Sequence, residues 1–199
     1  MRARLVAGVA LSLILQAQRA RAQPDAKGMR LSVNRVPHSR AVAVSMQVEV
    51  DAPLVYVQRV LLEVPAYPDW IPRVQWVRVR ATGSRWLLCE SALNLPWPLE
   101  DVRETVRVEW RRVRAGALIT WQHVRGDLRR NQGQWLLKRL SAQRTSVQYQ
   151  AELELGAWVP EFLIRRAEEK EAPWVVDGLR KRAAFYAHAG ASGHRMVSF

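Results

Sequence analysis

The sequence predicts an α+β domain in which an antiparallel β-sheet packs against a long C-terminal helix. Short apolar runs with a period of two residues, separated by turn residues, occupy most of positions 30–155. A helical pattern interrupts them at residues 53–64, and a longer one-sided pattern follows at residues 158–189. A helix that is apolar on one side needs a partner surface, and the strands can supply it.

Two strands and a helix open the domain. Residues 30–36 alternate loosely and are typical of an edge strand, whereas residues 41–50 alternate strictly between apolar and polar side chains. Asp51 is a favourable N-cap and Pro53 fits the first turn, so we expect a helix next. Residues 67–72 then form a compact corner that contains two large aromatic side chains.

Six further strands follow the corner and are separated by short turn signals. In the last of them, apolar side chains take the odd positions and Gln and Glu take the even ones. Strands joined by short turns favour an antiparallel meander with one face in water. We expect these strands at residues 74–80, 86–95, 102–110, 117–124, 134–140 and 146–155.

The C-terminal helix has a clear start and one internal irregularity. Pro160 suits a first helical turn, and Glu161 places a negative charge near the helix N-terminus. Pro173 lacks a backbone N–H and clashes with the preceding turn, so it should kink the helix or split it in two. Residues 190–199 are expected to be a loose tail.

The N-terminal segment has the pattern of a secretory signal peptide. A short basic region precedes an apolar run at residues 5–15, and Ala20-Arg21-Ala22 has the small residues that precede cleavage. We therefore expect cleavage near Ala22, a short leader at residues 23–28, and a periplasmic or secreted protein. The apolar run is short for a bilayer span, and an uncleaved anchor is the alternative.

The composition of the chain limits the classes of partner that we expect it to bind. The net charge is +13, and removal of residues 1–22 lowers it to +9. This charge is not concentrated in a block and no nucleic-acid motif accompanies it, so we expect no nucleic-acid partner. A weak attraction to an anionic membrane surface stays open. Cys89 is the only cysteine, which excludes an intrachain disulfide, and we expect a monomer stabilised by its core.

Short segments in a fixed order resemble the START-type domains of the SRPBCC superfamily. They are Val50-Asp51-Ala52-Pro53 with residues 67–72, then residues 95–101, residues 133–137 beside 145–149, and residues 156–160. The resemblance implies a helix-grip fold over residues 29–189, with a curved antiparallel sheet wrapped around the C-terminal helix. It also implies that an internal cavity binds a lipid or another hydrophobic small molecule without a cofactor.

The chain departs from the family pattern at one place. START-type domains often carry an Arg–Asp pair just after the Trp-Pro segment. Here Asp101 is followed by Val102, Arg103 and Glu104, so the pair is either displaced by one residue or replaced by Arg103 and Glu104.

A curved sheet folded around a helix leaves an apolar space that inward-facing side chains line. From the strands we expect the apolar and aromatic lining of Trp76, Leu88, Val106, Val108, Trp110, Ile119, Trp121, Trp135, Tyr149, Ala151 and Leu153. Phe162, Val176 and Leu179 would close the space from the helix side. The alternative is that these are ordinary core residues of a filled interior.

Five polar side chains could lie on the inner face and are candidates for contact with a ligand head group: Glu90, Glu104, His123, Arg129 and Tyr149. The alternative for each is a solvated or internally paired residue, since a buried unpaired charge is costly. No catalytic motif and no metal-ligand spacing is present, which favours a binding protein with no catalytic residues. A cyclase- or hydrolase-like enzyme that uses Tyr149 and His123 is one alternative. A protein that docks on a membrane or a partner through Trp70 and Trp97 is the other.

Overall fold

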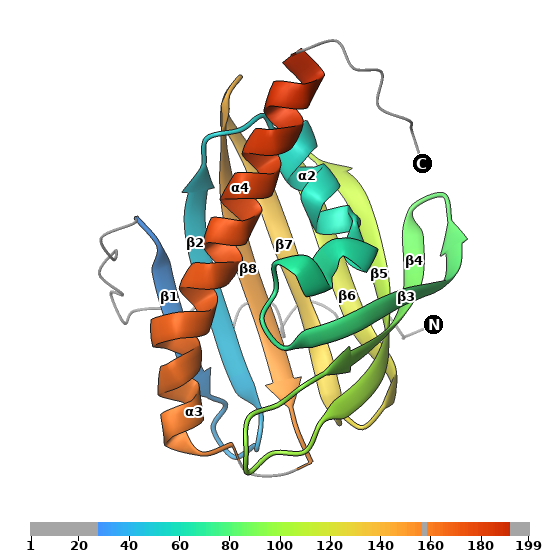
Figure 1. The fold of residues 1–199 in the computed structure, drawn as a ribbon, viewed down its shortest axis with the longest axis vertical. Helices are drawn as coiled ribbons and strands as arrows, with labels where there is room; N and C mark the ends of the chain where they lie inside the picture. Colours follow the sequence, from blue (N-terminus) through green and yellow to red (C-terminus); the bar gives the residue numbers. More distant parts are fainter. Residues whose placement is uncertain (1–27, 157–158, 192–199) are drawn as a thin grey trace, which may run out of the picture.

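The structure is a computed structural model that describes residues 28–156 and 159–191. The predicted signal peptide and most of the leader and of the tail lie outside these residues. Eight strands form one sheet that bends around a long helix (Figure 1). The strands are β1 (Arg30–Arg35), β2 (Val42–Val50), β3 (Val74–Gly83), β4 (Trp86–Leu93), β5 (Val102–Val113), β6 (Gly116–Gly126), β7 (Arg130–Ser141) and β8 (Arg144–Glu154).

Strands from the beginning and the end of the series, β2 and β8, pair with each other within the sheet. The strand order is β1-β2-β8-β7-β6-β5-β4-β3, and every neighbouring pair is antiparallel. Strands β3 to β8 form the expected meander, and β8 returns to pair with β2 over nine residues. The predicted helix-grip fold is confirmed.

The helices cover one face of this sheet. Helix α2 (Leu54–Leu62) and the 3₁₀ turn η1 (Val64–Asp69) follow β2. After β8 come α3 (Glu161–Arg166), the π-helical turn η2 (Ala167–Glu171) and α4 (Ala172–Ala191), which together run diagonally across the sheet (Figure 1).

Pro173 neither splits the helix nor ends it. The residues before it form the π-helical turn η2, in which the N–H of Ala172 donates to the carbonyl of Ala167, five residues earlier. A proline cannot donate an N–H to the preceding turn, and its ring crowds that turn's carbonyl. The wider π turn accommodates this crowding, so the chain stays helical through the irregularity.

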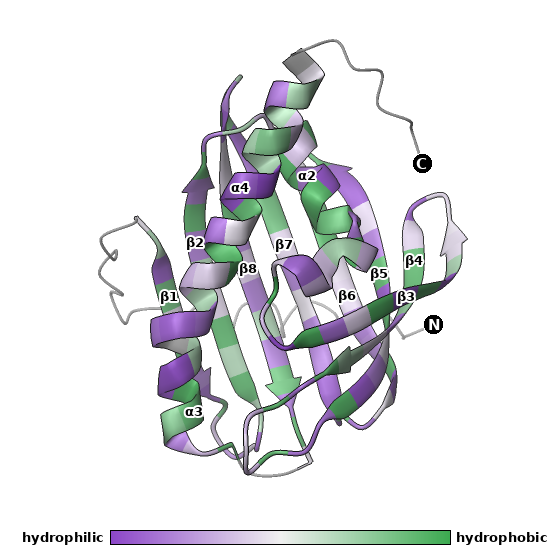
Figure 2. Cartoon of the chain, viewed as in Figure 1, coloured by the Kyte–Doolittle hydropathy of each residue, from purple (hydrophilic) through white to green (hydrophobic). Residues whose placement is uncertain are grey.

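The interior between sheet and helices contains two apolar clusters. The main cluster joins α2, the middle of the sheet and α4, and it includes the fully buried Leu61, Ile119, Leu137 and Leu179. The lower cluster joins α3 to the other end of the sheet, and its buried members are Val42, Val102, Leu128, Leu155, Val159, Leu163 and Ile164. Apolar and polar residues alternate along the strands that carry both (Figure 2).

Polar contacts fasten the helix to the rim of the sheet. The Arg73 guanidinium donates to Glu171 Oε1 through Nε at 3.0 Å and Nη2 at 2.8 Å. The Arg35 side chain donates to the Val159 carbonyl at 2.6 Å. Arg73 and Glu171 are only 25% and 24% exposed and Arg35 is 27% exposed, and together these contacts hold the start of the helical segment over the sheet. None of the described helices is long and apolar enough to cross a membrane.

Burial of apolar side chains on β7 should dominate its contribution to stability. Leu137 is completely buried in the main cluster, whereas Leu140 on the same strand is 50% exposed. Leu137→Ala should lower the free energy of unfolding by about 2–5 kcal/mol, because it removes buried methyl groups and leaves a void. Leu140→Ala is the matched control and should change it by less than about 0.5 kcal/mol. Urea denaturation measures both, and equal effects would contradict this assignment of the core.

Candidate functional site

The inner face of the sheet carries its smallest side chains at the centre. One register row joins Trp121, Gly133, Ala151 and Val44 across four neighbouring strands. The next row, toward the main cluster, joins Ile119, Trp135, Tyr149 and Met46, which are all large. Gly133 and Ala151 are therefore the small residues of this face, and they lie between the two apolar clusters.

Gly133 allows an aromatic side chain to cross its strand. A Cβ atom added there would lie 2.4 Å from Trp121 Cζ2 and 2.3 Å from the Gln150 carbonyl oxygen, closer than any side chain could tolerate. Because that space is free, the indole of Trp121 on β6 reaches over β7 and stacks on Tyr149 of β8, with ring centroids 5.5 Å apart. Trp135 packs against the same tyrosine at 4.4 Å. These aromatic contacts form one wall of the site.

A carboxyl group lies beside this aromatic wall. Glu104 on β5 is only 5% exposed, and Asn131 Nδ2 donates to its Oε1 at 2.7 Å and its Oε2 at 2.8 Å. Trp121 Nε1 donates to Asn131 Oδ1 at 2.8 Å. Since an indole N–H can only donate, this bond turns the amide nitrogen of Asn131 toward Glu104. Glu104, Trp121, His123 and Asn131 are called the interior polar cluster below.

His123 is the fourth member of the cluster, and no described residue is hydrogen-bonded to its Nδ1 atom. Its Nδ1 lies 3.9 Å from Glu104 Oε2, too far for a direct hydrogen bond. This buried nitrogen has no hydrogen-bond partner within the described residues. An unsatisfied buried polar atom is uncommon in folded proteins.

The environment shifts the proton affinity of the buried groups. Burial raises the pKa of Glu104 above its ordinary value of 4.5, although the Asn131 hydrogen bond and the neighbouring His123 act in the opposite direction. Burial also raises the pKa of Tyr149, and the nearby Glu104 adds to this effect. Both shifts have the direction expected when a charge loses its water shell.

The interior polar cluster lies between the two apolar clusters. Along β5, Val102 belongs to the lower cluster and Val108 to the main cluster, with Glu104 between them. Along β8, Leu153 packs against the lower cluster and Tyr149 against the main one. Trp121, His123, Asn131 and Tyr149 are all partly exposed, although they lie on the inner face of central strands.

Most of the lining that the sequence predicts lies on this inner face. The residues found within or packed against the main cluster are Val106, Val108, Trp110, Ile119, Trp121, Trp135, Tyr149, Val176 and Leu179. Leu153 packs against the lower cluster, and Ala151 lies between the two. Glu104 and His123 come together as described above.

The expectation that Leu88 and Glu90 line the interior is wrong. The neighbouring Cys89 and Ser91 are the buried residues of β4, so alternation turns Leu88 and Glu90 to the outer face. There Glu90 forms an ion pair with Arg80, which is 48% exposed.

Trp76 and Phe162 are likewise misplaced by the sequence pattern. A bulge between Val74 and Trp76 shifts the register of β3, so that Val77 packs on the core while the exposed Arg78 covers the Trp76 ring at 4.8 Å. Phe162 is 55% exposed, because Leu163 and Ile164 take the inward positions of α3.

The sequence pattern did not identify Asn131 or Gly133. We expected the strand to begin at residue 134, whereas β7 begins at Arg130. Asn131 and Gly133 have the same parity as Trp135 and Leu137, and that parity was the available signal. Cys89 and Tyr67 also lie inside; burial raises the pKa of the Cys89 thiol to about 11, which keeps it protonated and unreactive.

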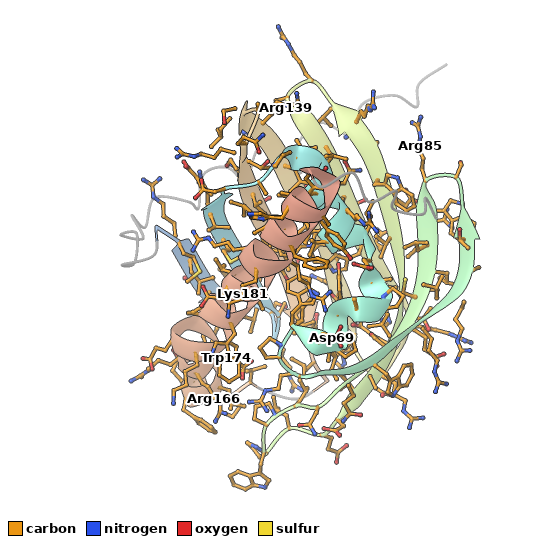
Figure 3. All side chains as sticks on the ribbon, turned by 45° about the horizontal axis from the view of Figure 1, so that its top comes forward. Asp69, Arg85, Arg139, Arg166, Trp174 and Lys181 are labelled. Carbon is orange, nitrogen blue, oxygen red and sulfur yellow. The ribbon has the colours of Figure 1, made fainter. Side chains whose placement is uncertain are left out.

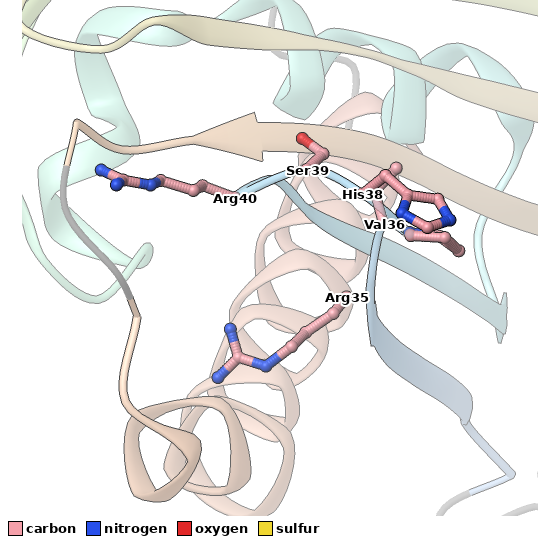
Figure 4. Close-up of a pocket in the computed structure, with 6 residues that line it drawn as sticks. Arg35, Val36, His38, Ser39 and Arg40 are labelled. Atoms are coloured by element: carbon pink, nitrogen blue, oxygen red, sulfur yellow. The ribbon is translucent and has the colours of Figure 1, made fainter.

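Two surface hollows are weaker candidates. One, of about 520 Å³, lies along the β1–β2 turn, where Arg40 and His38 extend to opposite sides (Figure 4). A single turn of consecutive residues forms it, and its arginines already bind the segment before α3. The other, of about 560 Å³, lies between η1 and α4, with Asp69, Trp174 and Lys181 around it (Figure 3).

Metal chemistry has no obvious location in the part of the chain that the structure describes. Over residues 28–156 and 159–191, no three His, Cys, Asp or Glu side chains come together in a way that could hold an ion. The interior polar cluster is therefore the candidate site on the strength of its hydrogen-bonding groups alone.

The raised pKa of Glu104 should make stability depend on pH. Between 4.5 and the raised value, the folded protein binds more protons than the unfolded chain, so the unfolding free energy falls as pH rises through this window. Glu104→Gln should lack this part of the slope, whereas Glu90→Gln on the outer face should keep it. Urea denaturation at a series of pH values from 4.5 to about 8 measures it. Identical slopes in all three proteins would contradict the assignment.

Comparison with known proteins supports the fold described above. The model of the family "Polyketide cyclase / dehydrase and lipid transport" matches residues 48–180, about two thirds of the chain. The search of curated proteins returns no match. Among solved structures, a STAR-related lipid transfer protein from Xanthomonas axonopodis shares 20% identity, with a TM-score of 0.69 over 81% of this chain and 97% of that one.

Two further structures show the breadth of this fold. Human STARD10 has a TM-score of 0.66 at 15% identity, over 83% of this chain and 73% of that one. The Zhui aromatase/cyclase from Streptomyces sp. R1128 has a TM-score of 0.57 at 18% identity, over 79% of this chain and 99% of that one. At these identities the likeness shows the fold alone, and the family match supplies the membership. The chain belongs to the polyketide cyclase / dehydrase and lipid transport family, and it shares its fold with STAR-related lipid transfer proteins.

Proposed function

We propose that this protein binds a lipid or another hydrophobic small molecule between the sheet and the helices, and that binding does not involve catalysis. The observation that carries the proposal is the interior polar cluster. A buried carboxyl and an unsatisfied histidine nitrogen lie between two apolar clusters. Such an interior is unfavourable by itself, and an apolar molecule with a polar end would satisfy both of its parts.

The end of the molecule that holds the lower cluster has features that support uptake of a ligand from a membrane surface. Leu95 and Leu99, in the connection between β4 and β5, pack against the lower cluster together with Leu163 of α3. This contact closes the interior next to Glu104. Figure 1 shows α3 and the β4–β5 connection at the same end of the molecule. Movement of either element would open a path inward, so this end is the proposed entrance.

Exposed aromatic and basic side chains surround the proposed entrance. Trp97 in the β4–β5 connection is 84% exposed, and Trp174 on α4 is 65% exposed. The exposed Arg165 and Arg166 belong to α3, and Figure 3 shows Arg166 near Trp174. Indole rings at a surface beside cationic side chains suit the interface of an anionic membrane. Trp70, in contrast, is 9% exposed and packs in the core, so it does not take part.

An enzyme with the same fold is the second candidate function. Glu104 and His123 form a buried acid–base pair with a perturbed carboxyl, which is a feature of many catalytic sites. One structural neighbour, Zhui, is an aromatase/cyclase. Recovery of a chemically altered molecule by the wild-type protein, but not by Tyr149→Phe or His123→Ala, would favour this candidate over binding alone.

We also propose that the protein acts in the periplasm or outside the cell, as a monomer. The basic start, the apolar run and the small residues that end at Ala22 support export. A leader that is removed would leave residues 23–199 as the working protein.

An apolar fluorophore should bind in the interior. Diphenylhexatriene has no polar group and fluoresces only away from water, so residues 23–199 should raise its emission in a saturable manner. Ala151→Trp should abolish this increase, because a second indole on the inner face would occupy the region between the two apolar clusters where the fluorophore is proposed to bind. Leu88→Trp places the same side chain on the outer face and should leave binding unchanged. Circular dichroism checks that both variants fold, and equal binding by all three proteins would overturn the proposal.

The exposed tryptophan of the proposed entrance should contribute to membrane association. Trp97→Ala should lower the fraction that sediments with vesicles of mixed anionic and neutral phospholipid, because an indole loses its place in the interface. Val124→Ala removes a 52%-exposed apolar side chain from β6 and is the control. Pure neutral vesicles should retain less of the wild-type protein. Equal sedimentation of all variants would remove Trp97 from the proposed surface.

Export should be visible in the mass of the mature chain. When the full sequence is expressed in a bacterium, intact-protein mass spectrometry should find a chain that begins at Gln23 in the periplasmic or secreted fraction. A chain that retains residues 1–22 in the membrane fraction would instead support the uncleaved anchor.

A further inference from the structure

We propose that the β5–β6 and β7–β8 turns form a second contact surface for anionic membranes, at the end of the molecule opposite the proposed entrance. One monomer then holds two membrane surfaces at the same time. This second contact rests on the proposed function, which supplies the first contact at the entrance.

Exposed arginines gather at the ends of two neighbouring hairpins. The backbone N–H of Arg139 donates to the Ala115 carbonyl at 3.1 Å, so the end of β7 lies directly beside the β5–β6 turn. The sequence separates these basic residues into two groups, and the pairing of β6 with β7 brings the groups together. The exposed arginines at these hairpin ends are called the tip cluster below: Arg111, Arg112, Arg114, Arg139 and Arg144.

Most of the charge in the tip cluster is not neutralised within the protein. Arg144 pairs with Asp51 at 3.1 Å and with Glu49 at 3.7 Å. None of the other four arginines forms an ion pair within residues 28–156 and 159–191. Guanidinium groups on neighbouring turns repel one another, so an anionic partner gains electrostatic energy and relieves this repulsion.

An exposed apolar side chain makes a membrane a better partner than an acidic protein. Leu140 follows Arg139 near the end of β7 and is 50% exposed. Across the hairpin Ser141 pairs with Arg144, so cationic side chains lie on both sides of the leucine. Such a tip suits an anionic bilayer, because the leucine enters the acyl boundary while the guanidinium groups stay among the phosphates. An acidic protein surface would use only the charges.

The length of β5 separates the two membrane contacts. Val102 at its start belongs to the lower cluster, and Val113 at its end leads into the β5–β6 turn. Its 12 residues span about 40 Å, several times the Debye length at physiological ionic strength. Figure 3 shows Arg139 and Arg166 at opposite ends of the molecule. Each end can therefore bind its own surface without strong repulsion between the two membranes.

Capture between two vesicle populations tests the second contact. Both populations contain equal parts of phosphatidylglycerol and phosphatidylcholine, and one carries a biotinylated lipid while the other carries a fluorescent lipid. Streptavidin beads should retain the fluorescent vesicles only when residues 23–199 are added, because each monomer links one vesicle of each kind.

A double variant without two of these charges locates the contact at the tips. Arg112→Gln combined with Arg139→Gln should lower the retention of fluorescent vesicles by at least about tenfold, since each basic side chain near an anionic surface contributes about fivefold to affinity. Sedimentation with a single vesicle population should persist, because the entrance is unchanged. Arg78→Gln combined with Arg80→Gln removes the same charge from exposed positions of β3 and should bridge the vesicles as the wild type does.

A fluorophore at the tip reports contact with the bilayer independently. Leu140→Cys labelled with an environment-sensitive nitrobenzoxadiazole dye should gain emission by at least about twofold when anionic vesicles are added. The same dye on Val79→Cys, at a 38%-exposed position of β3, should not respond. The buried Cys89 keeps its proton at neutral pH and does not compete for the dye.

The failures of the two proposals are distinguishable. Equal retention by the Arg112→Gln, Arg139→Gln variant and the wild type would overturn the second contact, and so would an unchanged emission of the dye on Leu140→Cys. Binding of the tips to soluble poly-glutamate without vesicle capture would overturn it in favour of an acidic protein partner. In each case, sedimentation that Trp97→Ala reduces would leave the entrance standing. Failure of the wild-type protein to sediment with anionic vesicles would overturn both contacts.

Discussion

The site depends on the close approach of the Trp121 indole to the backbone of β7 at Gly133. Any side chain at this position would occupy the space that the indole needs. From this approach follow the stacking on Tyr149 and the hydrogen bond from the indole to Asn131. The same bond sets the amide orientation that Glu104 requires. One missing Cβ atom thus links an aromatic wall to a buried carboxyl.

The interior polar cluster lowers the stability of the fold, while it places hydrogen-bonding groups in the interior. A carboxyl taken out of water and bound to one neutral amide is poorly compensated, which its raised pKa reflects. The two apolar clusters and the polar contacts of the helix, such as Arg73 with Glu171, supply the stability that this arrangement requires. Proteins commonly keep such locally unfavourable groups where they bind or react.

Much of the fold could be predicted from the sequence because its signals are local. The alternation of apolar and polar residues in β2 and β8 allows only one choice of inner and outer face. Strands joined by the short turns of the meander can pair only in the antiparallel direction. The cluster could not be predicted, because its members become neighbours only through the register between strands. Asn131 lies before the first strongly apolar residue of β7, so no periodic pattern included it.

Irregularities account for the residues that were misplaced. A bulge in β3 exchanges the faces of Trp76 and Val77, and an error of one position in β4 exchanges Leu88 with Cys89. Periodicity of two residues carries no information on such shifts, because both parities of these strands contain apolar side chains. Only the positions of neighbouring strands resolve the choice.

The π-helical turn of residues 167–171 has a consequence for the geometry of the long helix. A π turn takes up about one residue more than an α turn, so it rotates everything after it by roughly 100° relative to an uninterrupted helix. That rotation brings Ile164, Val176 and Leu179 to the side of the helix that faces the sheet, where the first belongs to the lower cluster and the other two to the main cluster. A single helical axis thereby serves two cores, and deletion of one residue within this turn would give a regular α-helix whose C-terminal half keeps the same side toward the sheet.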